Sequence, residues 1–279
     1  MSPPQGNQRA KSRREGVKRV NQAAIEKAAD ILWQARLSGR RLETLPADCR
    51  PGSLAEGYAI QDAMAVSSGQ AVVGWKIAAT SAAGQRHIGV SEPLAGRLFG
   101  GFLLPDGARL PAGPMHMRVV EAEFAFRFGR DLPARAEAYG MAEVMAAAAD
   151  LHLAIELPDA RFDRFAEIGA PSIAADDAFA AWFILGPQVS HWRSLDLPAQ
   201  PVRAIRNGEP AGEGSGANAL GDPRAALTWL VNERARRGSG VKAGEVVITG
   251  TCVKPVEIEP GDRVTVEFPG LGEVKVTFD

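Results

Sequence analysis

The sequence predicts an α+β fold in which a small helical layer precedes a larger body rich in strands. Three observations carry this prediction. Apolar residues recur at helix spacing within residues 21–70, and later segments alternate or form short apolar runs typical of strands. The chain then ends in strands joined by Pro-Gly turns. We therefore expect an arm at residues 1–20, a helical layer at 21–70 and one main body at 71–279.

Two helices are expected in the helical layer. The first covers residues 21–37, where apolar residues fall on one helix face and Gly39 provides a stop signal. The second begins at a capping box, in which Ser53 and Glu56 have the spacing that satisfies free N–H groups at a helix start.

Composition and charge exclude several classes of function for the chain as a whole. It has 279 residues and a net charge of −1, which gives no general affinity for nucleic acid or membranes. Cys49 and Cys252 are far apart and follow no metal spacing, so we expect free thiols and a cytoplasmic location. The basic arm at 1–20 lacks the apolar segment of a secretory signal, and we expect it to be disordered. A transit peptide or a nucleic-acid contact remains an alternative for it.

Residues 119–128 alternate strictly and predict a strand with two different faces. One face is apolar and suits the core. The other carries Glu121 and Glu123 side by side, where two like charges repel in a partly buried site. A divalent cation between them would remove the repulsion, and carboxylate oxygens suit Mg²⁺ or Mn²⁺. The alternative is an exposed face on which one glutamate pairs with Arg127.

A lysine and a third acid lie in other predicted strands. Lys76 is the one charged residue in the strand at 71–80, so it is either an edge lysine reaching for water or is aimed at an anion. Residues 142–153 are Ala-rich and predict a helix leading into an apolar run that holds Glu156. A buried unpaired carboxylate is costly, which makes Glu156 the natural third ligand.

The remaining segments are expected as follows. Residues 80–96 are polar and Gly-rich and predict a loop or mobile lid, and residues 180–185 predict a buried strand. Asp222 and Pro223 open a helix, as N-cap and first helical residue, that Gly238 ends. Three C-terminal strands follow at 245–249, 263–268 and 273–278.

Taken in order, these motifs resemble the fumarylacetoacetate hydrolase superfamily, and more closely its hydratase and decarboxylase branch, the 2-keto-4-pentenoate hydratases. The matching motifs include Gly74-Trp75-Lys76-Ile77, Val120-Glu121-Ala122-Glu123, Ala154-Ile155-Glu156, Gly221-Asp222-Pro223 and Thr249-Gly250-Thr251. The resemblance implies that residues 71–279 form the catalytic domain of that superfamily, a mixed β-roll or sandwich.

The resemblance also implies a site. Glu121, Glu123 and Glu156 would hold one Mg²⁺ or Mn²⁺ that binds a 2-oxo acid substrate. Lys76 would relay a proton or stabilise the enolate, unless it is an edge lysine. The Thr251 hydroxyl and nearby N–H groups would approach the substrate carboxylate, unless the segment is an ordinary turn.

The same metal site serves three reactions in this superfamily, so the fold alone does not choose among them. We expect a hydratase of aromatic-compound catabolism that adds water to a 2-hydroxydienoate. The alternatives are a decarboxylase, or a carbon–carbon hydrolase if His87 in the lid activates water. A further alternative is a weakly active partner subunit of a hydratase–decarboxylase complex. Relatives also lead us to expect a homo-oligomer.

The sequence departs from the hydratase pattern at two substrate-facing positions. Many hydratases have Ala-Asp-Asn-Ala-Ser-Ser where this chain places Asp177 and Phe179, and both changes favour a larger or more apolar substrate tail. We expect Lys254 or Arg86 to supply the cation that offsets Asp177. His152 should lie on the Glu156 side of its strand, as a structural histidine.

Overall fold

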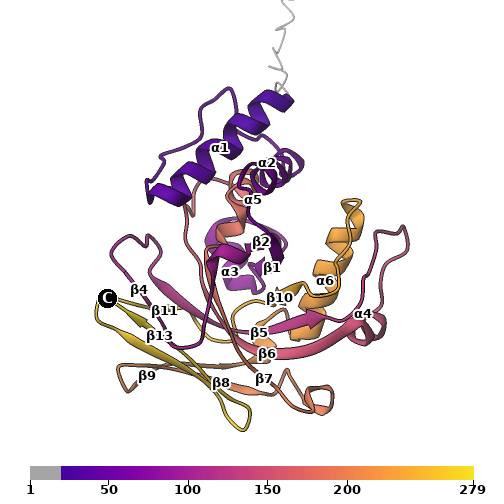
Figure 1. Ribbon diagram of the computed structural model, residues 1–279, viewed down its shortest axis with the longest axis vertical. Helices are drawn as coiled ribbons and strands as arrows, with labels where there is room; N and C mark the ends of the chain where they lie inside the picture. The colour runs from indigo at the N-terminus through magenta and orange to yellow at the C-terminus, as the bar shows by residue number, and fades with distance from the viewer. Residues whose placement is uncertain (1–19) are drawn as a thin grey trace, which may run out of the picture.

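The computed structural model describes residues 20–279 and contains two β-sheets with helices around them (Figure 1). The α+β prediction is confirmed, with a helical layer at one end and a roll of two curved sheets below it. The predicted basic arm lies outside the described residues, except for Val20.

The larger sheet has eight strands and contains the predicted carboxylate strand. Its order is β2-β1-β10-β5-β6-β7-β3, with β11 also paired to β5, and it mixes parallel and antiparallel pairs. The strands are β1 (Val72–Ala78), β2 (Leu94–Phe99), β3 (Leu103–Leu104), β5 (Val119–Phe128), β6 (Ala148–Leu157), β7 (Trp182–Gln188), β10 (Val246–Ile248) and β11 (Val256–Glu257).

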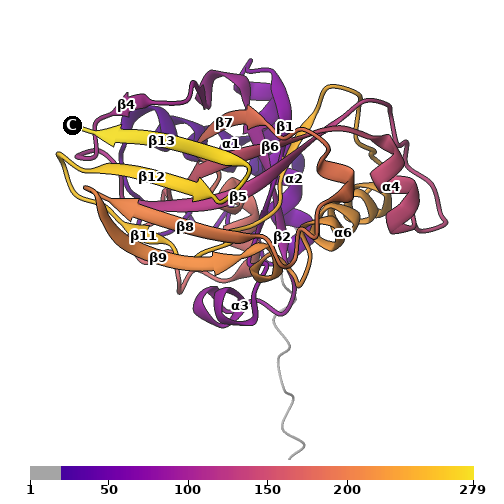
Figure 2. The same ribbon diagram turned by 90° about the horizontal axis from the view of Figure 1, so that it is seen from below.

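The second sheet has five strands in the order β4-β13-β12-β8-β9. These are β4 (Ala108–Leu110), β8 (Pro201–Arg206), β9 (Glu209–Ser215), β12 (Arg263–Phe268) and β13 (Gly272–Phe278). Seen from below, β13, β12, β8 and β9 lie side by side (Figure 2). Apolar side chains from this sheet and from one face of β5 share the main core, among them Phe124, Phe126, Val266, Phe268 and Val276.

Both helices of the predicted layer form. In α1 (Gln22–Ser38) left-handed Gly39 follows the end, as predicted, and Asn21, expected inside the helix, caps its start. In α2 (Leu54–Ser67) the Ser53 hydroxyl accepts the N–H of Glu56, but the Glu56 carboxylate accepts N–H groups of Val20 and Gly52. The expected capping box is therefore only half formed.

The helical layer shares its core with the main body. Buried residues of α1 and α2 form a cluster that also contains Phe99 of β2 and Phe162. The short helix α5 (Ala170–Ala175) packs on α2, and Gly57 allows the contact because a Cβ there would lie 2.2 Å from the Pro171 carbonyl oxygen. The division of the chain into a helical layer at residues 21–70 and a catalytic body at 71–279 stays a prediction.

Two local predictions need correction. The segment predicted as a loop or lid contains a helix, α3 (Ala82–Ile88), because Ser81 caps its start and Gly89 takes the left-handed conformation at its end. The predicted helix at 142–153 is shorter. Helix α4 (Met141–Ala147) is followed directly by β6, which begins at Ala148 because antiparallel pairing with β5 overrides the helix propensity of alanine.

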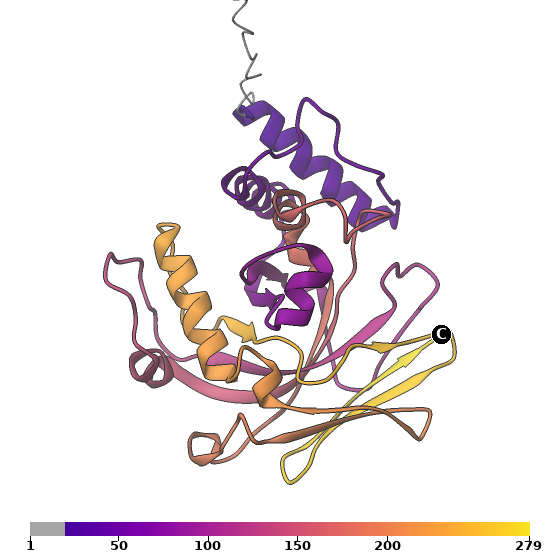
Figure 3. The same ribbon diagram turned by 180° about the vertical axis from the view of Figure 1, so that it is seen from behind.

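The helix α6 (Pro223–Arg236) starts and ends as predicted, with the Asp222 carboxylate accepting the N–H of Arg224. The view from behind shows α6 beside the larger sheet (Figure 3), and Arg237 at its end lies with its Cζ 3.1 Å from the ring centroid of Tyr58 in α2. Within residues 20–279, no helix has the length and apolar character that a membrane crossing requires.

Candidate metal centre

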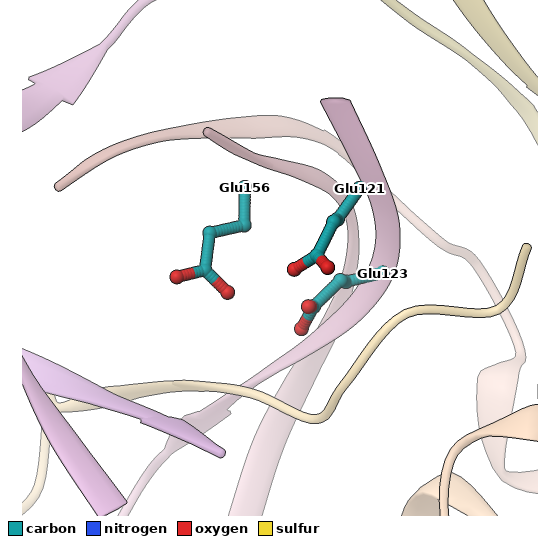
Figure 4. Close-up of side chains that lie close together, drawn as sticks. All are labelled: Glu121, Glu123 and Glu156. Carbon is teal, nitrogen blue, oxygen red and sulfur yellow. The ribbon is translucent and has the colours of Figure 1, made fainter. Parts of the chain in front are cut away.

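Three glutamates come together on one face of β5 and β6. Glu121 lies directly opposite Glu156 in the antiparallel register, and Glu123 follows Glu121 on the same face. Their carboxylates point toward one another, and one oxygen from each lies within 4.8 Å of the others (Figure 4). The register of one strand pair thus builds the whole cluster.

The cluster is buried and short of partners. Glu123 and Glu156 are each 1% exposed, whereas Glu121 is partly exposed. Glu123 Oε1 and Glu156 Oε2 have no hydrogen-bond partner in the described part of the chain. Buried carboxylate oxygens are normally satisfied, so these two atoms are suited to bind a cation.

The pKa values of the three carboxyl groups follow from this crowding. Burial, followed by the charge of Glu156, raises the pKa of Glu121 to about 7. Burial and the neighbouring carboxylates also raise the pKa of Glu123, while burial raises that of Glu156 against the opposing effect of Lys76. A proton or a cation is therefore favoured between them.

Lys76 is aimed at the cluster. Its strand β1 lies between β2 and β10, and the residue is 3% exposed, so the edge-lysine alternative is wrong. Its Nζ lies 2.9 Å from Glu156 Oε1 and donates a hydrogen bond of 3.1 Å to the Ala178 carbonyl. Burial lowers the pKa of Lys76, but the charges of Glu156 and Glu121 together raise it by more than burial lowers it. The net shift is upward, which keeps the ammonium charged.

The loop after β10 supports Glu123. The N–H of Gly250 donates a 2.7 Å hydrogen bond to Glu123 Oε2. Gly250 has φ +103°, and a Cβ there would lie 2.2 Å from Thr80 Oγ1, so only glycine fits. Thr251 is partly buried, and its hydroxyl donates to the Val253 carbonyl.

The cation beside Asp177 is Arg36, which corrects the expectation of Lys254 or Arg86. Asp177 is fully buried, and its Oδ2 lies 3.1 Å from Arg36 Nη2. Lys254 is exposed and lines a surface groove beside the β8–β9 turn, and Arg86 is exposed on α3. The sequence offered no signal for this pair because α1 and Asp177 are 141 residues apart.

Neither His87 nor His152 belongs to the carboxylate cluster. His87 is exposed on α3, and its ring meets the edge of Phe165 with centroids 6.2 Å apart. Within residues 20–279 no acid forms an ion pair or hydrogen bond with His87. His152 lies in β6 on the Glu156 face, where its Nδ1 is 3.1 Å from the Gly186 carbonyl oxygen.

The donor set fits a divalent cation. Three carboxylates and one ammonium leave two negative charges uncompensated, and the donors are hard oxygens of the kind that Mg²⁺ and Mn²⁺ prefer. Glu121, Glu123 and Glu156 could therefore hold such an ion, with Lys76 beside it.

The sequence profile of the fumarylacetoacetate (FAA) hydrolase C-terminal family matches residues 100–279. This chain belongs to the fumarylacetoacetate hydrolase family. A protein of Burkholderia vietnamiensis named 2-keto-4-pentenoate hydratase is 35% identical over 91% of this chain and 97% of its own length. A protein of Pseudomonas sp. (strain CF600) named 4-oxalocrotonate decarboxylase is 33% identical over 75% of this chain and 78% of its own length.

Solved structures of this family agree. The 4-oxalocrotonate decarboxylase from Pseudomonas putida G7, complexed with magnesium and adipate, matches with a TM-score of 0.86 and 28% identity, covering 94% of this chain and 99% of the other. The same protein was also solved with calcium and acetate. The predicted family and fold are thus confirmed.

The structure adds three groups that the sequence prediction missed. They are the Gly250 N–H at Glu123, the Ala178 carbonyl at Lys76 and the Arg36 guanidinium at Asp177. Backbone groups carry no residue-type signal, although the glycine in Thr249-Gly250-Thr251 marks a close backbone approach. In this family member they hold side chains around the carboxylate cluster.

Proposed function

We propose that this protein is a hydratase that requires Mg²⁺ or Mn²⁺ and adds water to a 2-hydroxydienoate or 2-oxo-3-enoate acid, in the catabolism of aromatic compounds. One observation carries the proposal. Glu121, Glu123 and Glu156 converge beside Lys76, with unsatisfied oxygens on Glu123 and Glu156, in a chain whose relatives of matching length are named 2-keto-4-pentenoate hydratase.

The residues divide the chemistry between them. The bound cation would act as a Lewis acid on the carbonyl of a 2-oxo acid. Lys76 Nζ is a charged donor beside that position, so it would stabilise negative charge on the substrate's 2-oxygen or hand over a proton. The Gly250 N–H fixes Glu123, and because the Thr251 hydroxyl already donates to the Val253 carbonyl, the Thr251 N–H would be the group that orients the substrate carboxylate.

The substrate tail is proposed to be apolar. Phe179 is 4% exposed, and its ring meets that of Phe165 edge to face at 5.6 Å. The Asp177 charge is matched by Arg36, so this ion pair offers no free charge to an anionic tail. An alkyl or aryl substituent suits these surroundings better than a second carboxylate does.

A decarboxylase is the second candidate. The observation in its favour is the likeness over nearly the full chain to the magnesium-bound decarboxylase structure. A carbon–carbon hydrolase has less support, because His87 lies on the exposed face of α3 without an acid partner among the described residues. A weakly active partner subunit would not need a lysine buried against Glu156.

A substrate screen tests the proposal. Purified protein is incubated with 2-hydroxypenta-2,4-dienoate, a 2-oxo-3-enedioate or acetylpyruvate, each with EDTA and with Mg²⁺ restored. Hydration of the dienoate without CO₂ release supports the hydratase, and CO₂ from the enedioate as the main reaction would favour the decarboxylase. Pyruvate from acetylpyruvate would favour the hydrolase.

Location and assembly are further parts of the proposal. Cys49 and Cys252 are both free and buried, which suits a reducing cytoplasm. We propose a homo-oligomer, and light scattering of the purified chain tests it. Co-purification with a related decarboxylase subunit would reveal a mixed assembly.

A further inference from the structure

A strained turn lies directly against Lys76. Asp177, Ala178 and Phe179 have φ values of 57°, 50° and 63°, so three successive residues other than glycine are left-handed. This conformation is unfavourable for each of them and persists only where the surroundings enforce it. Three such residues in succession therefore require contacts that stabilise the turn, and they suggest that the turn has a function.

The turn presents one carbonyl to the lysine. Ala178 O accepts a 3.1 Å hydrogen bond from Lys76 Nζ, the atom that lies 2.9 Å from Glu156. The turn also crosses β2 closely, since a Cβ on Gly96 would lie 2.2 Å from Asp177 O and 3.0 Å from Lys76 Cγ. Any displacement of the turn would therefore move the ammonium relative to the carboxylates.

Arg36 and the side chain of Asp177 hold the turn at both ends. At its start, Asp177 Oδ1 accepts the N–H of Arg97 at 2.7 Å and Oδ2 accepts from Arg36 Nη2 at 3.1 Å. At its end, the same Nη2 donates to the Ala180 carbonyl at 2.7 Å. One nitrogen of Arg36 thus ties Asp177, the first residue of the strained backbone, to Ala180, whose carbonyl also accepts from Arg161 Nη1 at 3.0 Å.

Arg36 itself is held firmly, and it comes from the helical layer. Its side chain is 4% exposed, and its Cζ lies 5.3 to 5.7 Å from the ring centroids of Trp33, Phe99 and Phe102. Burying a charged group is costly unless a partner compensates it, and Asp177 does so here. The last turn of α1 is therefore connected to the carboxylate cluster through fixed contacts.

We propose that Arg36 and Asp177 are positioning residues that fix the Lys76 ammonium through the left-handed turn. The helical layer then belongs to the catalytic apparatus rather than only covering it. The inference rests on the role that the proposed function gives to Lys76. Neither residue forms a hydrogen bond or ion pair with the three glutamates, so the contacts of both residues reach the carboxylate cluster through the turn.

The test compares substitutions in α1 and in the turn. Arg36→Met removes both clamps, and Asp177→Asn keeps the acceptor for the Arg97 N–H while removing the charge. The matched control is Lys27→Met, because Lys27 lies on the same helix as Arg36 and its substitution breaks only an exposed ion pair with Asp48. For each variant we would measure kcat, KM, the Mn²⁺ dissociation constant and thermal unfolding.

Arg36→Met should lower kcat about 10- to 100-fold, because a misplaced catalytic group loses that much. The Mn²⁺ dissociation constant and KM should stay within about threefold, since the three glutamates are untouched. In a Lys76→Gln background the same substitution should change kcat less than about twofold, because the turn no longer has an ammonium to place. An equal loss of kcat in both backgrounds would overturn the inference.

A second variant and a structure keep the test decisive if Arg36→Met does not fold. Arg36→Lys keeps the charge but not the planar guanidinium, and its metal-free crystal structure should show the Lys76 Nζ to Ala178 O contact broken. An unchanged contact would refute the inference whatever the activity. If Lys76→Gln itself leaves kcat intact, the proposed role of Lys76 fails, whereas a loss there without one in Arg36→Met refutes only the positioning.

Discussion

Glu121 of β5 faces Glu156 of β6 as a direct cross-strand pair, an arrangement of like charges that a sheet normally avoids. Glu123 adds a third carboxylate to the same face, and the buried ammonium of Lys76 lies beside them. The pair makes sense if a cation lies between the strands, and the predictions below follow from it.

The loop glycine beside Glu123 gives the first prediction. Gly250→Ala should weaken divalent metal binding about 10- to 100-fold, because the Cβ would collide with Thr80 and displace the N–H that supports Glu123. Gly244→Ala is the matched control, since Gly244 also has positive φ but open space around its Cα. Mn²⁺ titration monitored by electron paramagnetic resonance measures both. Equal effects of the two variants would show that backbone strain alone is responsible.

The second prediction concerns pH in the metal-free protein. Burial and Glu156 raise the pKa of Glu121 to about 7, above the value of about 4.3 for an unfolded glutamate. The folded chain therefore holds this proton more tightly, so its free energy of unfolding falls as pH rises from about 4.5 to 7. The loss should be on the order of 1 to 3 kcal/mol.

Urea unfolding of the metal-free protein and of Glu121→Gln across this pH range isolates the effect. The difference in stability between the variant and the wild type should grow in favour of the variant as pH rises. Saturating Mg²⁺ should reverse that order, because it stabilises the ionised wild-type site. A difference that stays constant with pH would mean that Glu121 ionises as freely as in the unfolded chain.

The third prediction concerns substrate choice. Phe179→Ser should raise kcat/KM for a substrate with an acidic tail relative to one with an apolar tail, by about 10-fold or more. The reason is that the ring that packs on Phe165 is replaced by a hydroxyl that can hydrogen-bond an anion. Competition between a 2-oxo-3-enedioate and an alkyl-substituted dienoate measures the ratio. No change in it would remove Phe179 from the substrate site.

The fourth prediction separates hydration from hydrolysis. His87→Ala should leave the hydration rate within about threefold of wild type, because His87 is exposed and we do not expect it to act as a general base. Loss of a true general base typically costs 10²- to 10⁴-fold in rate. Rates of the dienoate reaction at several pH values provide the measurement. A collapse of activity would instead assign His87 to the chemistry.

Local sequence patterns predicted those helices and strands whose own residues carry a clear helix or strand signal. The strand β5 alternates strictly, and α1 and α6 carry N-caps, so each formed where the sequence placed it. The start of β6 was mistaken for helix because alanine favours helices unless a partner strand is present. The strand β9, with the sequence Glu-Pro-Ala-Gly-Glu-Gly-Ser, has no apolar pattern and forms at the sheet edge.

The residues of the candidate site also fall into those that the sequence could identify and those that it could not. The three glutamates could be selected from the sequence, because two share a strand face and the third is a lone acid in an apolar run. Arg36 could not, because its pairing with Asp177 exists only after α1 has packed on the body. Contacts between residues far apart in the chain carry no local signal.

Metal-dependent turnover of 2-hydroxypenta-2,4-dienoate, followed by its absorbance, tests the central claim most directly. The wild-type protein treated with EDTA should be inactive and should recover when Mg²⁺ is added, whereas Glu123→Gln should stay at least about 100-fold slower with Mg²⁺ present. Glu257→Gln, on the exposed strand β11 that pairs with β5, should behave as wild type. Full turnover in EDTA, or in Glu123→Gln, would contradict a metal centre built from these three glutamates.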